Sequence, residues 1–292
     1  MNRIKLESML KEFFMEDIGD GDLSGEAVFS SKERGQFYLL AKQSGVFCGE
    51  EVIIAGFALI DPGSSVEMKV KDGDWITAGA VIAEVKGTMR GLLQGERVVL
   101  NLIQRMSGIA TFTHEVVART KGTKAKICDT RKTTPGLRML EKYAVQTGGG
   151  VNHRRGLYDA IMLKDNHIAF AGGIQQAVAK AKSFVGHTVK VEVEIETKAQ
   201  LEEAIEAQAD IIMFDNRTPE EIKEWITLVP PHITTEASGG IDLGNIREYA
   251  ESGVDYISLG ALTHSVKSLD ISAKVQPYVK KEESHDVYSR NA

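Results

Sequence analysis

The segment Val189-Lys-Val-Glu-Val-Glu-Ile195 alternates apolar β-branched residues with charged residues along its whole length. A period of two residues predicts a β-strand with valines and Ile195 on one face and with Lys190, Glu192 and Glu194 on the other. In a β-barrel, a strand that carries charge on its inner face belongs to a site and does not fill the barrel core.

Similar β-rich runs lie on both sides of this segment, and most of the intervals between them have a helical pattern. The runs are Lys126–Asp129, Ala160–Leu163, Asp210–Phe214, His232–Ala237 and Asp255–Leu259. Thr218-Pro-Glu-Glu221 offers a helix start, with an N-cap, a proline at the first helical position and acids in the first turn. Strands and helices that alternate every ~20–30 residues predict parallel βαβ units.

A doubly wound sheet and a βα barrel both satisfy this alternation. The first strand lacks the GxGxxG turn of a dinucleotide-binding sheet. Glycine and polar residues follow the carboxyl ends of several strands, which is where a barrel builds its site. We therefore expect an α/β fold whose larger domain is a TIM-like barrel.

The first third of the chain has a different rhythm. It predicts a helix to about Glu16 and strands at Phe37–Ala41 and Val66–Val70, which together indicate a smaller α+β sandwich domain. Gly91–Thr120 is apolar at helical period and predicts a long helix that links two domains. The expected boundaries are an N-terminal α+β domain at 1–110, a βα-barrel domain at 111–274 and a C-terminal tail at 275–292.

The composition narrows the class of protein. The 292 residues are 42% hydrophobic and 26% charged, which is typical of a globular protein. A net charge of −6 argues against general nucleic-acid binding, and no run of ~18 uncharged apolar residues predicts a membrane span. Cys48 and Cys128 stand far apart outside any metal-ligand pattern, so we expect reduced thiols and a cytoplasmic enzyme.

A cluster of basic residues gives one segment of this acidic chain a net positive charge. Between residues 131 and 167 there are seven Arg or Lys against three acids. Four of these cations, together with His153, lie at three predicted strand ends or loops: Arg131 and Lys132, His153 and Arg154, and Lys164. The triple glycine Gly148–Gly150 would let the backbone approach a ligand closely. Three elements that aim cations at one mouth predict a polyanion site, whereas Arg138, Glu141 and Lys142 indicate a solvated helix face.

The later strands contribute acids and glycine turns. Glu194 and Asp215 lie at successive strand ends, where carboxylates accept hydrogen bonds from sugar hydroxyls or hold a hydrated Mg²⁺; a simple charge pair with the cations is the equal alternative. Glu236-Ala-Ser-Gly-Gly-Ile241 and Ser258-Leu-Gly-Ala-Leu-Thr-His-Ser265 end the last two strands. Glycine turns at these positions, each opening a helix N-terminus, commonly seat a phosphate in βα barrels.

A series of motifs in a fixed order resembles the quinolinate phosphoribosyltransferase family, the carboxylating nicotinate-nucleotide pyrophosphorylases. The motifs are Gly95-Glu-Arg-Val-Val-Leu-Asn101, Ser107-Gly-Ile-Ala-Thr111, Thr130-Arg-Lys-Thr-Thr-Pro-Gly136, Gly148-Gly-Gly-Val-Asn-His-Arg154, Lys164-Asp-Asn-His167, Val191-Glu-Val-Glu194, Glu236-Ala-Ser-Gly-Gly-Ile241 and Gly260-Ala-Leu-Thr-His-Ser265. The resemblance covers the chain to about Lys274, and Ser24 stands where the family is expected to have threonine.

The resemblance implies an incomplete βα barrel and a homodimer whose active sites face the other subunit's N-terminal domain, with a higher oligomer left open. It implies phosphoribosyl transfer from phosphoribosyl pyrophosphate to quinolinate, with decarboxylation, in NAD biosynthesis. The expected partners are these small molecules alone, without nucleic acid or membrane. The expected cofactor is Mg²⁺, carried by the substrate pyrophosphate, with Glu194 and Asp215 as candidate ligands.

The resemblance also assigns residues to ligands. Quinolinate would be held by Arg131, His153, Arg154 and Lys164, with Arg97 supplied by the partner subunit. Lys132, beside Thr130, would meet the pyrophosphate. Glu194 and Asp215 would serve the ribose and the metal. The 5′-phosphate region would comprise Ser238, Gly239, Gly240, Gly260 and His264.

Three other functions account for some of these residues. A Schiff-base lyase would use Lys164 as its nucleophile, which needs a desolvated lysine with a lowered pKa. A storage or sensor protein for a phosphorylated metabolite would need the glycine turns but not the paired acids. A related molybdenum-pathway protein would share the fold and phosphate turns, but the dicarboxylate-binding set, which includes Arg97, favours quinolinate.

Overall fold

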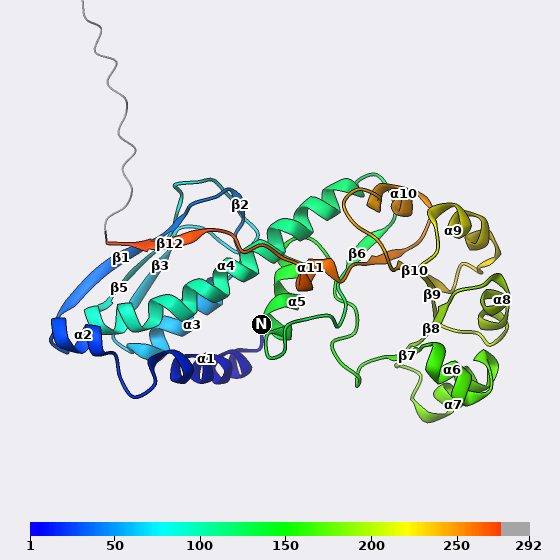
Figure 1. Ribbon diagram of the computed structural model, residues 1–292, viewed down its shortest axis with the longest axis horizontal. Coiled ribbons are helices and arrows are strands. Elements are labelled where there is room, and N and C mark those ends of the chain that lie inside the picture. The colour runs from blue at the N-terminus through cyan, green and yellow to red at the C-terminus, as the bar shows by residue number, and fades with distance from the viewer. Residues whose placement is uncertain (276–292) are drawn as a thin grey trace, which may run out of the picture.

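The chain folds into two lobes that share one long helix (Figure 1). The computed structural model describes residues 1–275, so the predicted tail at 275–292 lies outside the described residues except for Val275. The shared helix, α4 (Met89–Arg119), occupies the predicted linking stretch. Within residues 1–275, no helix is long and apolar enough to cross a membrane.

The N-terminal lobe packs helices against an antiparallel sheet with the order β12-β1-β5-β3. Its strands are β1 (Arg34–Ala41), β3 (Ser65–Met68), β5 (Val81–Thr88) and β12 (Ile271–Lys274), beside a small sheet of β2 (Gly45–Val46) and β4 (Trp75–Ile76). Its helices are α1 (Arg3–Ile18), α2 (Leu23–Val28) and α3 (Glu50–Ile60). Phe37 and Phe57 meet edge to face in the core, with ring centroids 5.5 Å apart.

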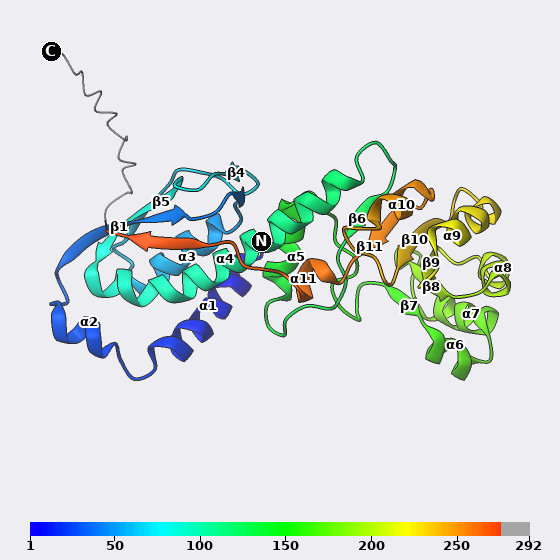
Figure 2. The same cartoon turned by 45° about the horizontal axis from the view of Figure 1, so that its top comes forward.

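The last strand of the chain belongs to the first lobe. Residues 271–274 were expected in the barrel domain, but β12 pairs antiparallel with β1, and Ala41 lies opposite Ile271. Figure 2 shows β12 beside β1 after the chain has returned from the barrel. The side chain of Ile271 is 1% exposed. Burial of this apolar side chain in the first lobe therefore decides where the strand lies, although its neighbours in sequence belong to the barrel.

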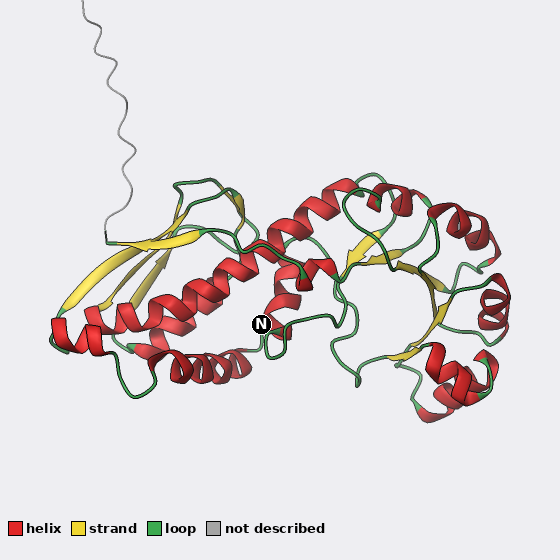
Figure 3. Cartoon of the chain, viewed as in Figure 1, coloured by secondary structure: helices red, strands yellow, loops and turns green. Residues whose placement is uncertain are grey.

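The second lobe is an open barrel of six parallel strands in the order β6-β11-β10-β9-β8-β7. The strands are β6 (Lys126–Cys128), β7 (Ile161–Leu163), β8 (Val191–Ile195), β9 (Ile211–Asp215), β10 (Thr234–Ser238) and β11 (Tyr256–Ser258). Figure 3 shows them as an arc with the helices outside. The expectation of an incomplete βα barrel is therefore confirmed.

The helices of this lobe follow the strands in the predicted alternation. They are α5 (Arg138–Thr147), α6 (Asp165–Ala171), α7 (Ile174–Phe184), α8 (Lys198–Glu206), α9 (Pro219–Trp225) with the 3-10 turn η1 (Ile226–Leu228), α10 (Ile246–Glu251) and α11 (Ala261–His264). Thr218 caps α9 by accepting from the backbone N–H of Glu221, as the sequence predicts. The barrel is open between β6 and β7, where Val151 forms an isolated parallel bridge with Cys128.

Candidate active site

A cavity of about 710 Å³ opens at the carboxyl ends of the parallel strands. Every predicted site residue lines it, apart from Arg97. They come from the loop after β6 (Thr130, Arg131, Lys132), the segment after Val151 (His153, Arg154), the end of β7 (Lys164), the ends of β8 and β9 (Glu194, Asp215) and the turns at the ends of β10 and β11 (Ser238, Gly239, Gly240, Gly260, His264). Residues far apart in sequence therefore meet because parallel strands end at one rim.

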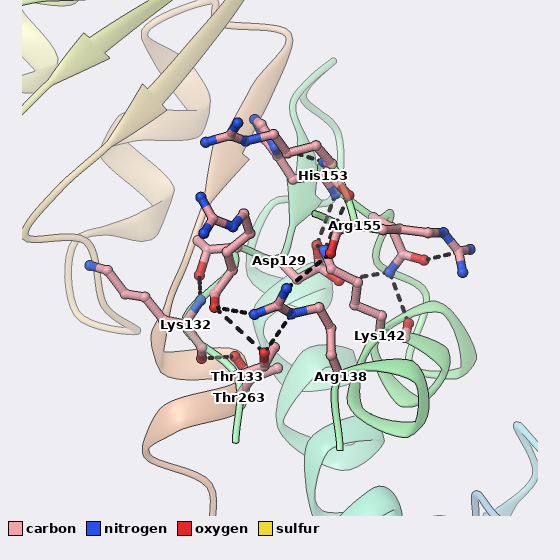
Figure 4. Close-up of polar contacts among 12 residues, drawn as sticks. Asp129, Lys132, Thr133, Arg138, Lys142, His153, Arg155 and Thr263 are labelled. Atoms are coloured by element: carbon pink, nitrogen blue, oxygen red, sulfur yellow. Dashed lines mark hydrogen bonds and ion pairs between the residues drawn. The ribbon is translucent and has the colours of Figure 1, made fainter. Parts of the chain in front are cut away.

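The loop after β6 holds two exposed cations at the rim. The backbone N–H of Lys132 donates to Thr130 Oγ1 at 3.0 Å, and Thr263 Oγ1 donates to the Lys132 carbonyl at 2.7 Å (Figure 4). Arg138 of α5 donates from Nε to Thr133 Oγ1 at 2.9 Å. These contacts fix the loop backbone, while the side chains of Arg131 and Lys132 stay exposed to receive an anion.

Arg154 is a half-buried cation on the wall of the cavity. Burial lowers the pKa of its guanidinium, the nearby charge of Arg131 lowers it further, and the acids Glu192 and Asp159 oppose both effects. The two guanidinium groups are thus held close enough to repel one another. An anion bound between them would relieve that repulsion, and a planar carboxylate suits the guanidinium fork.

Lys164 and Glu194 form an ion pair across neighbouring strands β7 and β8. Burial raises the pKa of Glu194, Lys164 opposes the rise, and the charge of Asp215 on β9 adds to it. The two carboxylates therefore lie close together at the rim. Their mutual repulsion favours a bound cation or hydroxyl donors between them.

The glycine turns at the ends of β10 and β11 differ from the expected pair of helix starts. Gly239 (φ +89°) and Gly240 (φ +64°) adopt left-handed backbone, but α10 begins only at Ile246, so this turn does not open a helix. Gly260 does precede α11 directly. A Cβ on Gly260 would lie 2.8 Å from Lys132 Cδ and 2.9 Å from His264 Cδ2, so glycine lets two rim loops pack together.

Two buried acids that sequence reasoning missed lie beside His153: Glu236, which lines the cavity, and Glu192, which lines an adjoining second cavity. His153 Nε2 lies 3.1 Å from Glu192 Oε2 and 3.5 Å from Glu236 Oε2. Burial lowers the pKa of His153, but the hydrogen bond to Glu192 and the charges of both acids outweigh it, so the pKa is raised. The alternation of β8 indicated that Glu192 shares a face with Glu194, and that signal could have identified it.

A buried ion pair fixes the segment that carries His153. Asp129 and Lys142 are 0% and 1% exposed and pair with each other (Figure 4). Asp129 also accepts from the backbone N–H of His153 at 2.8 Å and from Asn152 Nδ2 at 2.7 Å, while Lys142 donates to the His153 carbonyl at 3.1 Å. The pair therefore holds the backbone of His153 on both sides.

The expectation that Arg138, Glu141 and Lys142 form a solvated helix face is wrong. The side chain of Glu141 is 1% exposed, forms an ion pair with Arg105 of α4, and accepts a hydrogen bond from Arg105 Nε at 2.8 Å. Arg105 also donates to the Thr263 carbonyl at 2.9 Å, which ties α4 and α5 to the short helix α11. The pattern of charges could not reveal that Glu141 and Lys142 are buried, because α4, which lies far from α5 in sequence, covers α5.

The triple glycine serves packing and not approach to a ligand. A Cβ on Gly148 would lie 2.4 Å from the Ala110 carbonyl oxygen of α4, and one on Gly150 would lie 2.8 Å from Val145 Cγ1. Neither glycine lines the cavity. The small residues let the chain turn tightly against α4 and so set the position of the following His153.

Arg97 lies away from the cavity of its own chain. It is exposed on α4, whereas its neighbours Val99 and Ile103 are 0% exposed within the single chain. The chain's own core covers these apolar neighbours, so their burial does not require a second subunit.

The chain matches known sequences and structures along nearly its whole described length. The profile of the quinolinate phosphoribosyl transferase N-terminal domain matches residues 22–107, and that of the C-terminal domain matches residues 109–274. The probable nicotinate-nucleotide pyrophosphorylase, carboxylating, of Bacillus subtilis (strain 168) is 55% identical over 94% of this chain and 95% of its own. The protein of the same name from Methanocaldococcus jannaschii is 40% identical, over 92% and 97%.

A solved structure agrees with these sequence matches. The crystal structure of NadC from Streptococcus pyogenes superposes with a TM-score of 0.90 at 43% identity, covering 94% of this chain and 97% of that one. Both domains, their order and their fold are therefore common to this chain and its relatives. The chain belongs to the quinolinate phosphoribosyltransferase family.

Proposed function

We propose that this enzyme transfers the phosphoribosyl group of phosphoribosyl pyrophosphate to the ring nitrogen of quinolinate. The products are nicotinate mononucleotide, CO₂ and pyrophosphate, in a step of NAD biosynthesis. One observation carries the proposal: a single cavity gathers cations from three elements, two carboxylates from neighbouring strands and two glycine turns. The names of the relatives agree with this chemistry.

The cations suit the quinolinate end of the reaction. Quinolinate carries two adjacent ring carboxylates, and the mutual repulsion of Arg131 and Arg154 favours an anion between them. Lys164 and His153 would complete the set from the adjoining wall and floor. Pairing both carboxylates in one orientation would direct the ring nitrogen toward the anomeric carbon of the ribose.

The opposite side of the cavity suits the ribose phosphate. We assign Lys132 to the pyrophosphate, the turns at Ser238–Gly240 and Gly260 with His264 to the 5′-phosphate, and Glu194 and Asp215 to the ribose. Backbone N–H groups of glycine turns bind phosphate without a side chain in the way. Two carboxylates near the phosphate subsite also fit Mg²⁺, which takes one or two carboxylates plus phosphate oxygens.

The chain's residues would act mainly by orientation and charge. When bound, Mg²⁺ neutralises charge on the departing pyrophosphate. Glu194 and Asp215 would stabilise the positive charge that develops on the ribose as the bond to pyrophosphate breaks. Ring nitrogen attack then makes the pyridinium, whose positive charge would stabilise the electron pair that stays on ring carbon 2 when CO₂ departs. The Lys164–Glu194 ion pair favours a charged ammonium over a Schiff-base nucleophile.

We further propose a cytoplasmic homodimer with shared active sites. Both cysteines, Cys48 and Cys128, are free and buried, which supports a reducing compartment. The exposed position of Arg97, outside its own cavity, supports a role in the cavity of a partner subunit.

The direct test is to incubate the protein with quinolinate, phosphoribosyl pyrophosphate and Mg²⁺. We expect nicotinate mononucleotide, CO₂ and pyrophosphate in equal amounts, by chromatography and by release of label from carboxyl-labelled quinolinate. Omission of Mg²⁺ should stop the reaction. Binding of the ribose phosphate without any turnover of quinolinate would contradict the proposal.

A further inference from the structure

The cluster of His153, Glu192 and Glu236 has a defined hydrogen arrangement. His153 Nδ1 lies 2.8 Å from the backbone nitrogen of Arg154, whose N–H donates to it. Nδ1 therefore acts as an acceptor and carries no hydrogen in the neutral ring. The ring hydrogen lies on Nε2, the atom that faces both carboxylates.

This arrangement favours protons over a metal ion at the cluster. The three side chains place ligand atoms within 4.8 Å of one another, a spacing that a metal ion could bridge. A metal on Nε2 would move the ring hydrogen to Nδ1, where it would point at the N–H of Arg154. The cluster therefore favours hydrogen bonds between His153 Nε2 and the two carboxyl groups over a shared metal ion.

Glu236 is the member of the cluster whose surroundings favour a protonated carboxyl group. Its Oε1 is buried and has no hydrogen-bond partner among the described residues, although the nearby Ser258 hydroxyl lowers the pKa of Glu236; this position is more costly for a carboxylate than for a carboxylic acid. Burial and the charge of Glu192 raise the pKa of Glu236 to about 7. The ionisable groups that face it are Glu192, His153, Asp129 and Cys128. A bound dicarboxylate would add negative charge and favour the protonated form further.

Glu236 also lies between two cavities. It lines the active-site cavity and a second cavity of about 640 Å³ whose lining includes the first residues of strands, Ile211, Thr234 and Tyr256. The second cavity includes exposed residues such as Lys190, so solvent enters it at the amino ends of the strands. Glu236, itself 4% exposed, thus borders a second cavity that is open to solvent while a substrate fills the active-site cavity.

We propose that Glu236 is the acid that protonates the ring carbon from which CO₂ departs. The inference rests on the proposed function, because decarboxylation creates the demand for a proton. The bond between ring carbon 2 and its carboxylate breaks reversibly, the electron pair stays on carbon 2 beside the pyridinium nitrogen, and CO₂ recombines with that pair unless the pair is protonated first. That pair takes the proton of Glu236, and the resulting carboxylate regains a proton from water in the second cavity. No oxidant or further reactant is needed.

The test separates the two chemical steps in a single turnover of Glu236→Gln, with pyrophosphate and labelled CO₂ measured in the same quenched samples. The amide nearly matches the shape of the acid but has no transferable acidic proton. We expect pyrophosphate release within a few-fold of wild type and CO₂ release about 10²-fold slower, so that the carboxylated nucleotide accumulates. Glu236→Asp should restore part of the CO₂ step.

Glu194→Gln is the matched control, because it removes a carboxylate assigned to the first step. It should slow both products together. Loss of both products in the same proportion in Glu236→Gln, or CO₂ release in step with pyrophosphate at the wild-type rate, would overturn the role of Glu236. Failure of wild-type protein to make either product would overturn the proposed function instead.

A second measurement needs no variant and covers the case in which Glu236→Gln does not fold. An acid acts in its protonated form, so the wild-type CO₂ step should slow as pH rises through the pKa of Glu236, about 7 in the free protein and higher with a bound anion. The step should also be slower in D₂O. A CO₂ step that is constant between roughly pH 6 and 9 would contradict the inference.

Discussion

At the scale of single residues, the place of an arginine in the structure, and not its residue type, decides whether it contacts the substrate cavity. Arg131 and Arg154 line the cavity, whereas the adjacent Arg155 lines only the second cavity and Arg138 fixes a loop backbone. The sequence predicted the cavity arginines because Arg131 follows a strand end and Arg154 follows the triple glycine Gly148–Gly150. It could not reveal Glu236 as a floor residue, because a glutamate inside the mixed strand Thr234–Ser238 has the same sequence signal whether it faces a ligand or a neighbouring side chain.

The charge arrangement predicts a selective loss in Arg154→Ala and Arg131→Ala. Each should weaken quinolinate binding far more than binding of phosphoribosyl pyrophosphate. Removing one partner of a desolvated charge pair costs about 2–5 kcal/mol, since the remaining carboxylate is left uncompensated. Calorimetric titration of each ligand into each variant measures the difference.

Arg155→Ala is the control for this prediction. It removes the same charge one residue further along the chain, outside the active-site cavity. Its quinolinate affinity should stay close to wild type. Equal losses for both ligands in the Arg154 and Arg131 variants would contradict the assignment of these residues.

At the scale of elements, the strands and helices of the barrel follow the sequence closely, but the roles of two segments do not. The β8 strand occupies Val191–Ile195 inside the predicted run, because alternation sets its period. The α5 helix also forms where its pattern predicts, yet Glu141 and Lys142 are buried. A local pattern predicts a helix but not which of its charges α4 covers, because that depends on a contact between segments distant in sequence.

The buried pair on α5 predicts a large loss of stability in Lys142→Met. Methionine fills much of the space but leaves the carboxylate of Asp129 buried without its charge partner. The free energy of unfolding should fall by about 3–5 kcal/mol, as expected when one member of a buried ion pair is removed. Urea denaturation followed by circular dichroism measures this change.

The comparison variant is Lys198→Met, which breaks an exposed ion pair with Glu224. It should cost no more than about 1 kcal/mol, because exposed pairs contribute little.

The Lys142 variant should also raise the KM for quinolinate, since the backbone of His153 loses a hydrogen-bond donor. Similar stability for both variants would mean that the buried pair does not hold the segment.

At the scale of the whole molecule, the chain begins and ends in the same lobe. The parallel barrel could be predicted because each βα unit is local in sequence. The return of β12 to β1 could not, because Ile271–Lys274 is only four residues long and its partner strand lies more than two hundred residues earlier. Closing the sheet this way ties the barrel to the N-terminal lobe at two places, through α4 and through β12.

The position of Arg97 predicts that separately inactive variants will restore each other. Arg97 is exposed on α4 and lies outside the cavity of its own chain, whereas Lys164 lines that cavity. If each active site takes Arg97 from the partner subunit, Arg97→Ala and Lys164→Ala are each inactive as pure dimers. In a hybrid dimer, one site has both residues and the other site has neither.

Mixing the two variants in equal amounts under subunit exchange should therefore restore activity. Random exchange makes half of the dimers hybrid, each with one competent site, so about a quarter of wild-type activity is expected. Native mass spectrometry of differently tagged subunits verifies the exchange. If exchange is complete and activity stays absent, Arg97 serves its own subunit. A monomer at working concentration would likewise contradict the shared site, because the cavity would then have to bind quinolinate without Arg97.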